Sequence, residues 1–180
     1  MPTYSQHLLY LSIAVAAALV AAVWDVKTRR IPNWLTASSI LIGLALHLIL
    51  GGPREMAMAL LAALVGGGIF TAFFIAGGMG GGDVKLIAAV ASIVSFPSLF
   101  QVLVTTAIMG GVFALVLAMA RGKLKQTVQN IGLLFFHHRH EGLTPHPQLN
   151  VRNDRTLRLP YAIAIAAGCL ITFISEIPLK

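Results

Sequence analysis

The chain has very few charged residues, and acids are the scarcest of them. Only 11% of its 180 residues are charged, six are Asp or Glu, and 57% are hydrophobic. An ordinary soluble domain contains about 25% charged residues. The composition excludes that class and predicts an all-α membrane protein that forms one domain over residues 1–180.

Cysteine is almost absent, since Cys169 is the only one. A lone cysteine excludes an intrachain disulfide and a four-cysteine zinc site. The net charge of +7 would suggest nucleic acid as the partner of a soluble protein, but no patch interleaves basic and aromatic residues. We therefore expect membrane lipid around the chain, no nucleic acid, and neither a cofactor nor a metal.

Long apolar runs dominate what is present. Most are close to the roughly 20 residues that span the hydrocarbon of a bilayer, and they cover residues 7–24, 34–50, 55–76, 84–95, 98–120 and 159–177. No Lys or Arg precedes the first run, which favours a retained helix over a cleaved signal peptide. Pro97 separates the fourth run from the fifth. The triplet Gly66 to Gly68 predicts a close contact between helices.

Basic residues decide the topology. With six transmembrane helices and both termini outside, in the periplasm, one face of the membrane holds 11 of the 13 basic residues, all except Arg54 and Lys180. Merging the fourth and fifth runs would move segment 121–158, with its seven basic residues, to the other face. The positive-inside rule rejects that arrangement, so 121–158 is predicted to be a cytoplasmic loop of a multi-pass protein.

Two aspartates stand at helix ends on this predicted cytoplasmic face. Asp25 ends the first helix and Asp83 opens the fourth, so both lie at similar depth. Acids at membrane depth are costly and usually functional. A pair of carboxylates that shares a proton is the core of aspartic protease chemistry. Whether the two are laterally close does not follow from the sequence.

Each acid also has a structural interpretation. Asp83 precedes a helix and is a favourable N-cap, while Asp25 is a candidate for a weak ion pair with Lys27 or Arg29. Five glycines, Gly77, Gly78, Gly80, Gly81 and Gly82, lead into Asp83. They predict either room for an extended substrate backbone or a mobile linker. Lys85 extends toward lipid headgroups or acts on a nearby carboxylate.

The cytoplasmic segment contains a second kind of pattern. Leu124, Val128, Ile131 and Phe135 recur at steps of three and four, which predicts an amphipathic helix on the membrane surface. The histidine-rich stretch 137–150 that follows is predicted to be an irregular, solvated loop rather than a metal site. His7 and His47 are predicted to lie at the outer interface.

The motifs around the two acids carry a resemblance. Asp25-Val-Lys-Thr-Arg-Arg-Ile31-Pro32-Asn33 resembles the first motif of type IV prepilin peptidases, and Gly80-Gly81-Gly82-Asp83-Val84-Lys85-Leu86 resembles their second, the GxGD motif. The resemblance implies catalytic Asp25 and Asp83 supported by Pro32, Asn33, Gly80, Gly82 and Lys85. It also implies a bacterial inner-membrane aspartic endopeptidase that cleaves basic leaders from prepilins at the cytoplasmic face.

The short length is most similar to the peptidases of tight-adherence (Flp) pilus systems. Larger family members contain a cytoplasmic insertion with paired CxxC motifs linked to N-methylation, which this chain lacks, so methyltransferase activity is not expected. Where relatives often show Pro-Tyr-Gly, this chain has Pro160-Tyr161-Ala162. Two other functions remain open: a small ion- or proton-coupled transporter that uses both aspartates, and an inert assembly subunit of a secretion machine.

Overall fold

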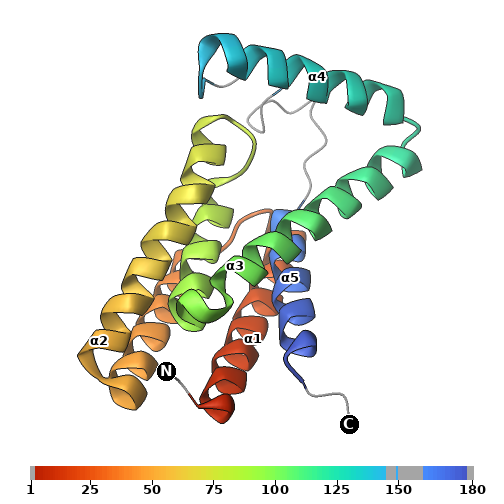
Figure 1. The fold of residues 1–180 in the computed structure, drawn as a ribbon. Coiled ribbons are helices and arrows are strands. Elements are labelled where there is room, and N and C mark those ends of the chain that lie inside the picture. The colour runs from red at the N-terminus through yellow and green to blue at the C-terminus, as the bar shows by residue number, and fades with distance from the viewer. Residues whose placement is uncertain (1–2, 145–148, 150–159, 178–180) are drawn as a thin grey trace.

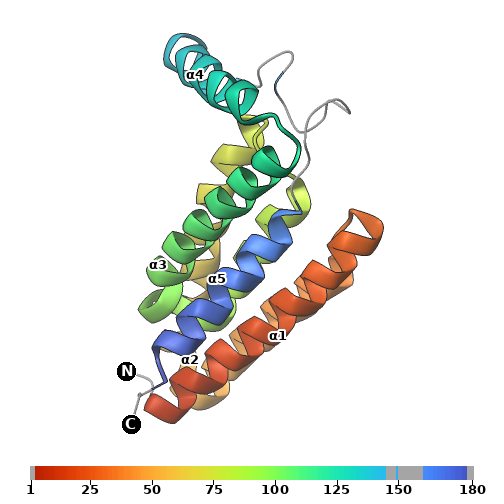
Figure 2. The same ribbon diagram turned by 90° about the vertical axis from the view of Figure 1, so that its right-hand side faces the viewer.

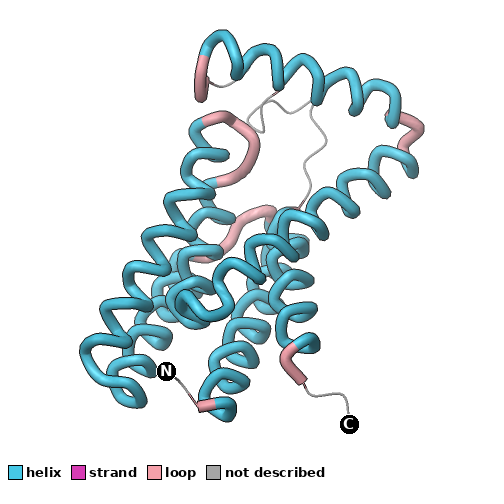
Figure 3. Tube along the Cα trace, in the orientation of Figure 1, coloured by secondary structure: helices cyan, strands magenta, loops and turns pink. Residues whose placement is uncertain are grey.

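The fold of the described residues is entirely helical. The computed structural model describes residues 3–144, 149 and 160–177, and no strand occurs among them (Figure 1 and Figure 3). The helices are α1 (Tyr4–Thr28), α2 (Asn33–Ile75), α3 (Gly81–Ala120), α4 (Leu124–Glu141) and α5 (Tyr161–Ser175). Three of them, α1, α2 and α3, are long and apolar enough to cross a membrane.

The two longest helices each break near their middle. In α2 the break is at Gly52, whose φ of 80° is accessible mainly to glycine, and Pro53 starts the second arm. In α3 the break is at Ser95, with φ of 54°, two residues before Pro97. Both breaks coincide with the boundaries predicted between apolar runs. Figure 1 shows each helix reversing direction there.

The helix ends gather at two opposite ends of the bundle. The start of α1 lies next to the end of α5, and the Tyr4 hydroxyl donates a hydrogen bond to the Glu176 carbonyl at 2.9 Å. At the other end lie the α1–α2 and α2–α3 connections and α4, which crosses the bundle (Figure 1 and Figure 2). The amphipathic helix predicted after residue 121 is therefore present as α4, at the same end as both motif segments.

Side-chain size is distributed as expected for a lipid environment. The buried positions are rich in alanine and glycine, including Ala14, Ala18 and Ala62, which are all fully buried. Many large apolar side chains point outward, and Ile49 and Phe100 are each 77% exposed. Small residues let helices approach closely, while lipid accepts the large ones. The close helix contact predicted at the glycine triplet forms at two of its residues. Gly66 packs on Ala91 and Gly67 on Ala88, whereas Gly68 faces open space.

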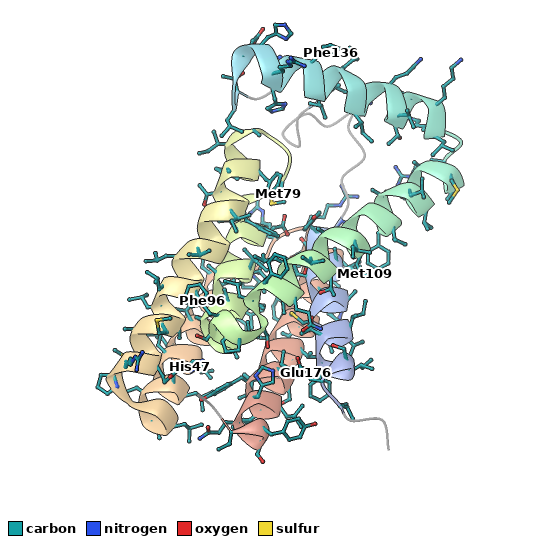
Figure 4. The ribbon with its side chains drawn as sticks, viewed as in Figure 1. His47, Met79, Phe96, Met109, Phe136 and Glu176 are labelled. Carbon is teal, nitrogen blue, oxygen red and sulfur yellow. The ribbon has the colours of Figure 1, made fainter. Side chains whose placement is uncertain are left out.

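His47 is buried rather than interfacial, and the break in α3 explains why. In a continuous helix the Ile93 carbonyl would accept from residue 97, but Pro97 has no N–H. His47 Nε2 lies 3.0 Å from that carbonyl oxygen and donates to it, and the ring stacks on Tyr10 at 4.3 Å. The side chain is only 2% exposed, and Figure 4 labels it on α2. His7, by contrast, is partly buried and bonds Ser98.

The contribution of this bond is measurable with two variants. His47→Leu leaves the Ile93 carbonyl unpaired and should lower the free energy of unfolding by about 1–2 kcal/mol. His47→Gln retains a donor and should lose less. Because both variants remove the ring that stacks on Tyr10, the difference between them isolates the hydrogen bond. Thermal unfolding in detergent is the measurement, and equal melting of the two variants would contradict the assignment.

The histidine stretch corrects one prediction. α4 continues to Glu141, so residues 137–141 are helical and not an irregular loop. His138 and His140 bond the carbonyls of Leu134 and Phe136, each four residues earlier, at 2.7 and 2.9 Å. Both bonds run from a side chain to a carbonyl one turn earlier on the same helix. Residues 145–148 and 150, also predicted as loop, lie outside the described residues.

Candidate active site

Asp25 lies in the last turn of α1, one turn before the chain leaves the helix. Arg29 adopts the left-handed conformation with φ of 53°, and its N–H donates to the Asp25 carbonyl at 2.7 Å. An acid near a helix C-terminus is unfavourable for the helix dipole. Among the described residues no Lys or Arg lies within 4.0 Å of its carboxylate, so the predicted ion pair with Lys27 or Arg29 does not occur.

The glycine-rich approach to Asp83 has a defined backbone. Gly77 has φ of 78° and its N–H donates to the Phe74 carbonyl at 3.1 Å, while the Gly78 N–H donates to the Phe73 carbonyl at 2.9 Å. This is the Schellman arrangement that ends helices. The connection between α2 and α3 is therefore a specific turn that reverses the chain and starts α3 at Gly81.

Asp83 is the third residue of α3 and not its N-cap. Gly80 occupies the N-cap position, and its N–H donates to Asp83 Oδ2 at 3.2 Å. The bond uses one carboxylate oxygen and helps to orient the side chain, which is partly buried. A Cβ at Gly80 would lie 3.2 Å from the same oxygen, so a larger residue there would crowd the carboxylate.

The two motif segments are in direct contact. Lys85 Nζ donates to Asn33 Oδ1 at 2.9 Å, which joins the first turn of α3 to the first turn of α2. Pro32 immediately precedes α2 in extended conformation. Gly82 packs on Ile31, where a Cβ would lie 3.4 Å from the isoleucine Cβ. The structure thus brings together all seven predicted site residues on one end of the bundle.

The two carboxylates are also electrostatic neighbours. The charge of Asp25 acts on Asp83, and both side chains are partly buried. Like-charged carboxylates at close range cannot easily both ionise, so such a pair tends to hold one proton. The arrangement can therefore supply a general base and a general acid together, which is what hydrolysis of an amide by an activated water requires.

One further polar group was not predicted as part of the site. The Tyr161 phenol, at the start of α5, lies within electrostatic reach of Asp83. The sequence signal was weak: Pro160-Tyr161 opens the last apolar run on the same predicted side as both acids. Its lateral position beside Asp83 depends on how α5 packs against α3.

Fold and site together define a helical membrane protein with a pair of interacting carboxylates at the ends of two helices. The model of the type IV leader peptidase family matches residues 12–115, more than half of the chain. The chain belongs to that family and is accordingly a protease. The matched region contains both motif segments but not α5. Neither the comparison with curated proteins nor the comparison with solved structures yields a match.

Proposed function

We propose that this protein is an aspartic endopeptidase that removes the leader from prepilin-like substrates, with Asp25 and Asp83 as its catalytic pair. The observation that carries the proposal is the direct contact of the two motif segments, through the Lys85–Asn33 hydrogen bond and the packing of Gly82 on Ile31. Both carboxylates are partly buried at this junction, and the charge of Asp25 acts on Asp83. The remaining predicted site residues, Gly80, Gly82 and Pro32, shape the turns that present the acids.

The proposed topology has six membrane crossings in a bacterial inner membrane, with both termini in the periplasm. α1, the two arms of α2, the two arms of α3 and α5 are the crossings, and α4 lies on the cytoplasmic surface. Basic residues concentrated at the acid-bearing end support this orientation. Trp24 and Trp34, stacked edge to face at 5.8 Å and exposed, support an interface at that depth.

The chemistry follows from a shared proton. The ionised carboxylate takes a proton from a water whose oxygen attacks the scissile carbonyl carbon, while the protonated carboxyl donates a hydrogen bond to the carbonyl oxygen. The tetrahedral intermediate collapses with cleavage of the C–N bond, and the proton passes to the leaving amine. The carboxylates exchange roles between the two steps. No cofactor or metal takes part in this scheme.

The proposed substrate is a Flp-type prepilin with a short basic leader and an apolar helix. Cleavage would occur at the cytoplasmic face, after a glycine that precedes the helix. The position of both acids at helix ends supports this, because a substrate helix lying in the bilayer would present its preceding residues at the same depth. Methyltransferase activity is not proposed, since the chain lacks the paired CxxC motifs.

The test is cleavage by the purified protein in proteoliposomes. The probe is a synthetic precursor with a basic leader, a glycine at the junction and an apolar helix, and the products are identified by mass spectrometry. We expect one cut after the glycine, and a matched precursor with valine at that position should remain intact. Absence of cleavage, together with ion flux that depends on the aspartates, would favour the transporter instead.

A further inference from the structure

Tyr161 is positioned by three helices at the acid-bearing end of the bundle. It is the first residue of α5, and Pro160 precedes it in extended conformation. Its ring packs edge to face on Phe70 of α2, with ring centroids 6.0 Å apart. Its hydroxyl lies over Gly110 of α3, where a Cβ would come within 2.8 Å of the phenol oxygen. The ring and hydroxyl are therefore held from two sides.

Gly110 is what makes room for the hydroxyl. A Cβ there would also come within 3.1 Å of the Tyr161 ring carbon Cζ, closer than nearly all real contacts of that kind. The neighbouring Gly111 faces open space instead. α5 itself lies between α3 and α1 (Figure 2). The helix that carries the phenol thus packs against both helices that carry the acids.

The phenol is a further polar group within electrostatic reach of Asp83. The charge of Asp83 acts on Tyr161, as the charge of Asp25 acts on Asp83. A phenol carries its proton at neutral pH and is a hydrogen-bond donor. Amide hydrolysis builds negative charge on the carbonyl oxygen, and a preorganised donor aimed at that oxygen is usually a large contribution to catalysis. Lys85, the nearest basic residue in the motif, already donates to Asn33.

We propose that Tyr161 is a third catalytic residue, whose hydroxyl donates a hydrogen bond to the scissile carbonyl oxygen as the tetrahedral intermediate forms. The inference rests on the proposed peptidase function. It adds the phenol to the protonated carboxyl as a second donor to the carbonyl oxygen, while the acids alone transfer protons. It also explains why a glycine faces the hydroxyl, because any side chain at residue 110 would displace the donor.

Three variants test the assignment on the full-length protein with the same synthetic precursor. Tyr161→Phe keeps the ring and its contact with Phe70 but removes the donor, so kcat should fall about 10²-fold while KM and the melting temperature stay close to wild type. Gly110→Ala keeps the hydroxyl but displaces it, so kcat should fall in the same direction. Gly111→Ala, the matched control, should behave as wild type.

Each outcome has a defined meaning. Wild-type kcat in Tyr161→Phe overturns the proposal, and so does a rise in KM with unchanged kcat, which would make the phenol a binding contact. If Gly110→Ala fails to fold, Tyr161→Phe alone decides. An active wild type with a fully active Tyr161→Phe refutes this inference but leaves the peptidase intact. An inactive wild type refutes both, because a catalytic donor requires a reaction.

Discussion

Asp25→Asn and Asp83→Asn should each abolish cleavage, with kcat reduced by at least about 10³-fold. A general acid or base contributes roughly 10²–10⁴-fold, and an amide can neither accept the proton of the attacking water nor return one to the leaving amine. Because the two acids act as one unit, the double variant should be no worse than either single variant. Single-turnover cleavage of the synthetic precursor measures the loss.

Asparagine at residue 83 removes the acid but keeps the local hydrogen bond, because the introduced amide oxygen can still accept from the Gly80 N–H. Alanine would lose that bond and cost about 1 kcal/mol of stability, which would mix folding with catalysis. Glu141→Gln on α4 is the matched control, since it removes an exposed carboxylate that belongs to neither motif. Full cleavage by either aspartate variant would refute the assignment of roles.

Gly43→Ala and Gly168→Ala should lower the stability of the fold more than any other substitution of a glycine by alanine. Gly43 of α2 faces Ser92 of α3, where a Cβ would come within 2.8 Å of the backbone carbon and oxygen. Gly168 of α5 faces Thr106 of α3, where it would come within 2.7 Å of the backbone nitrogen. Backbone atoms cannot rotate away as a side chain can, so the helices must separate. Such overpacking costs about 1–3 kcal/mol per site.

Gly68→Ala and Gly111→Ala are the controls, because a Cβ at either position meets nothing within 4 Å. Alanine is favoured over glycine in a helix by about 1 kcal/mol, so these variants should melt at or above the wild-type temperature. Thermal unfolding in one detergent compares all four. If the buried and the open glycines tolerate alanine equally, the close helix approach described above is wrong.

Local signals in the sequence were sufficient to predict most of the helices and the breaks within them. Proline acts on the backbone within a few residues, so Pro97 marked the break in α3. The boundary between two apolar runs marked the break in α2, which the structure places at Gly52 and Pro53. The error at the end of α4 has the same local origin. Histidine-rich stretches carry little helix signal, yet α4 continues through His138 and His140 to Glu141.

The motifs also indicated the two acids and the end of the bundle at which they lie, because chain direction and apolar length determine where each helix ends. The sequence did not determine which helices lie side by side. A helix that is apolar all round has no face that selects a partner, so the sequence was silent on whether the charge of Asp25 reaches Asp83 and on the Lys85–Asn33 bond. For the same reason it placed His47 at the interface, where the structure buries it. The position of Tyr161 within electrostatic reach of Asp83 is of the same kind, since it depends on close packing at Gly110 between residues about 50 positions apart in the chain.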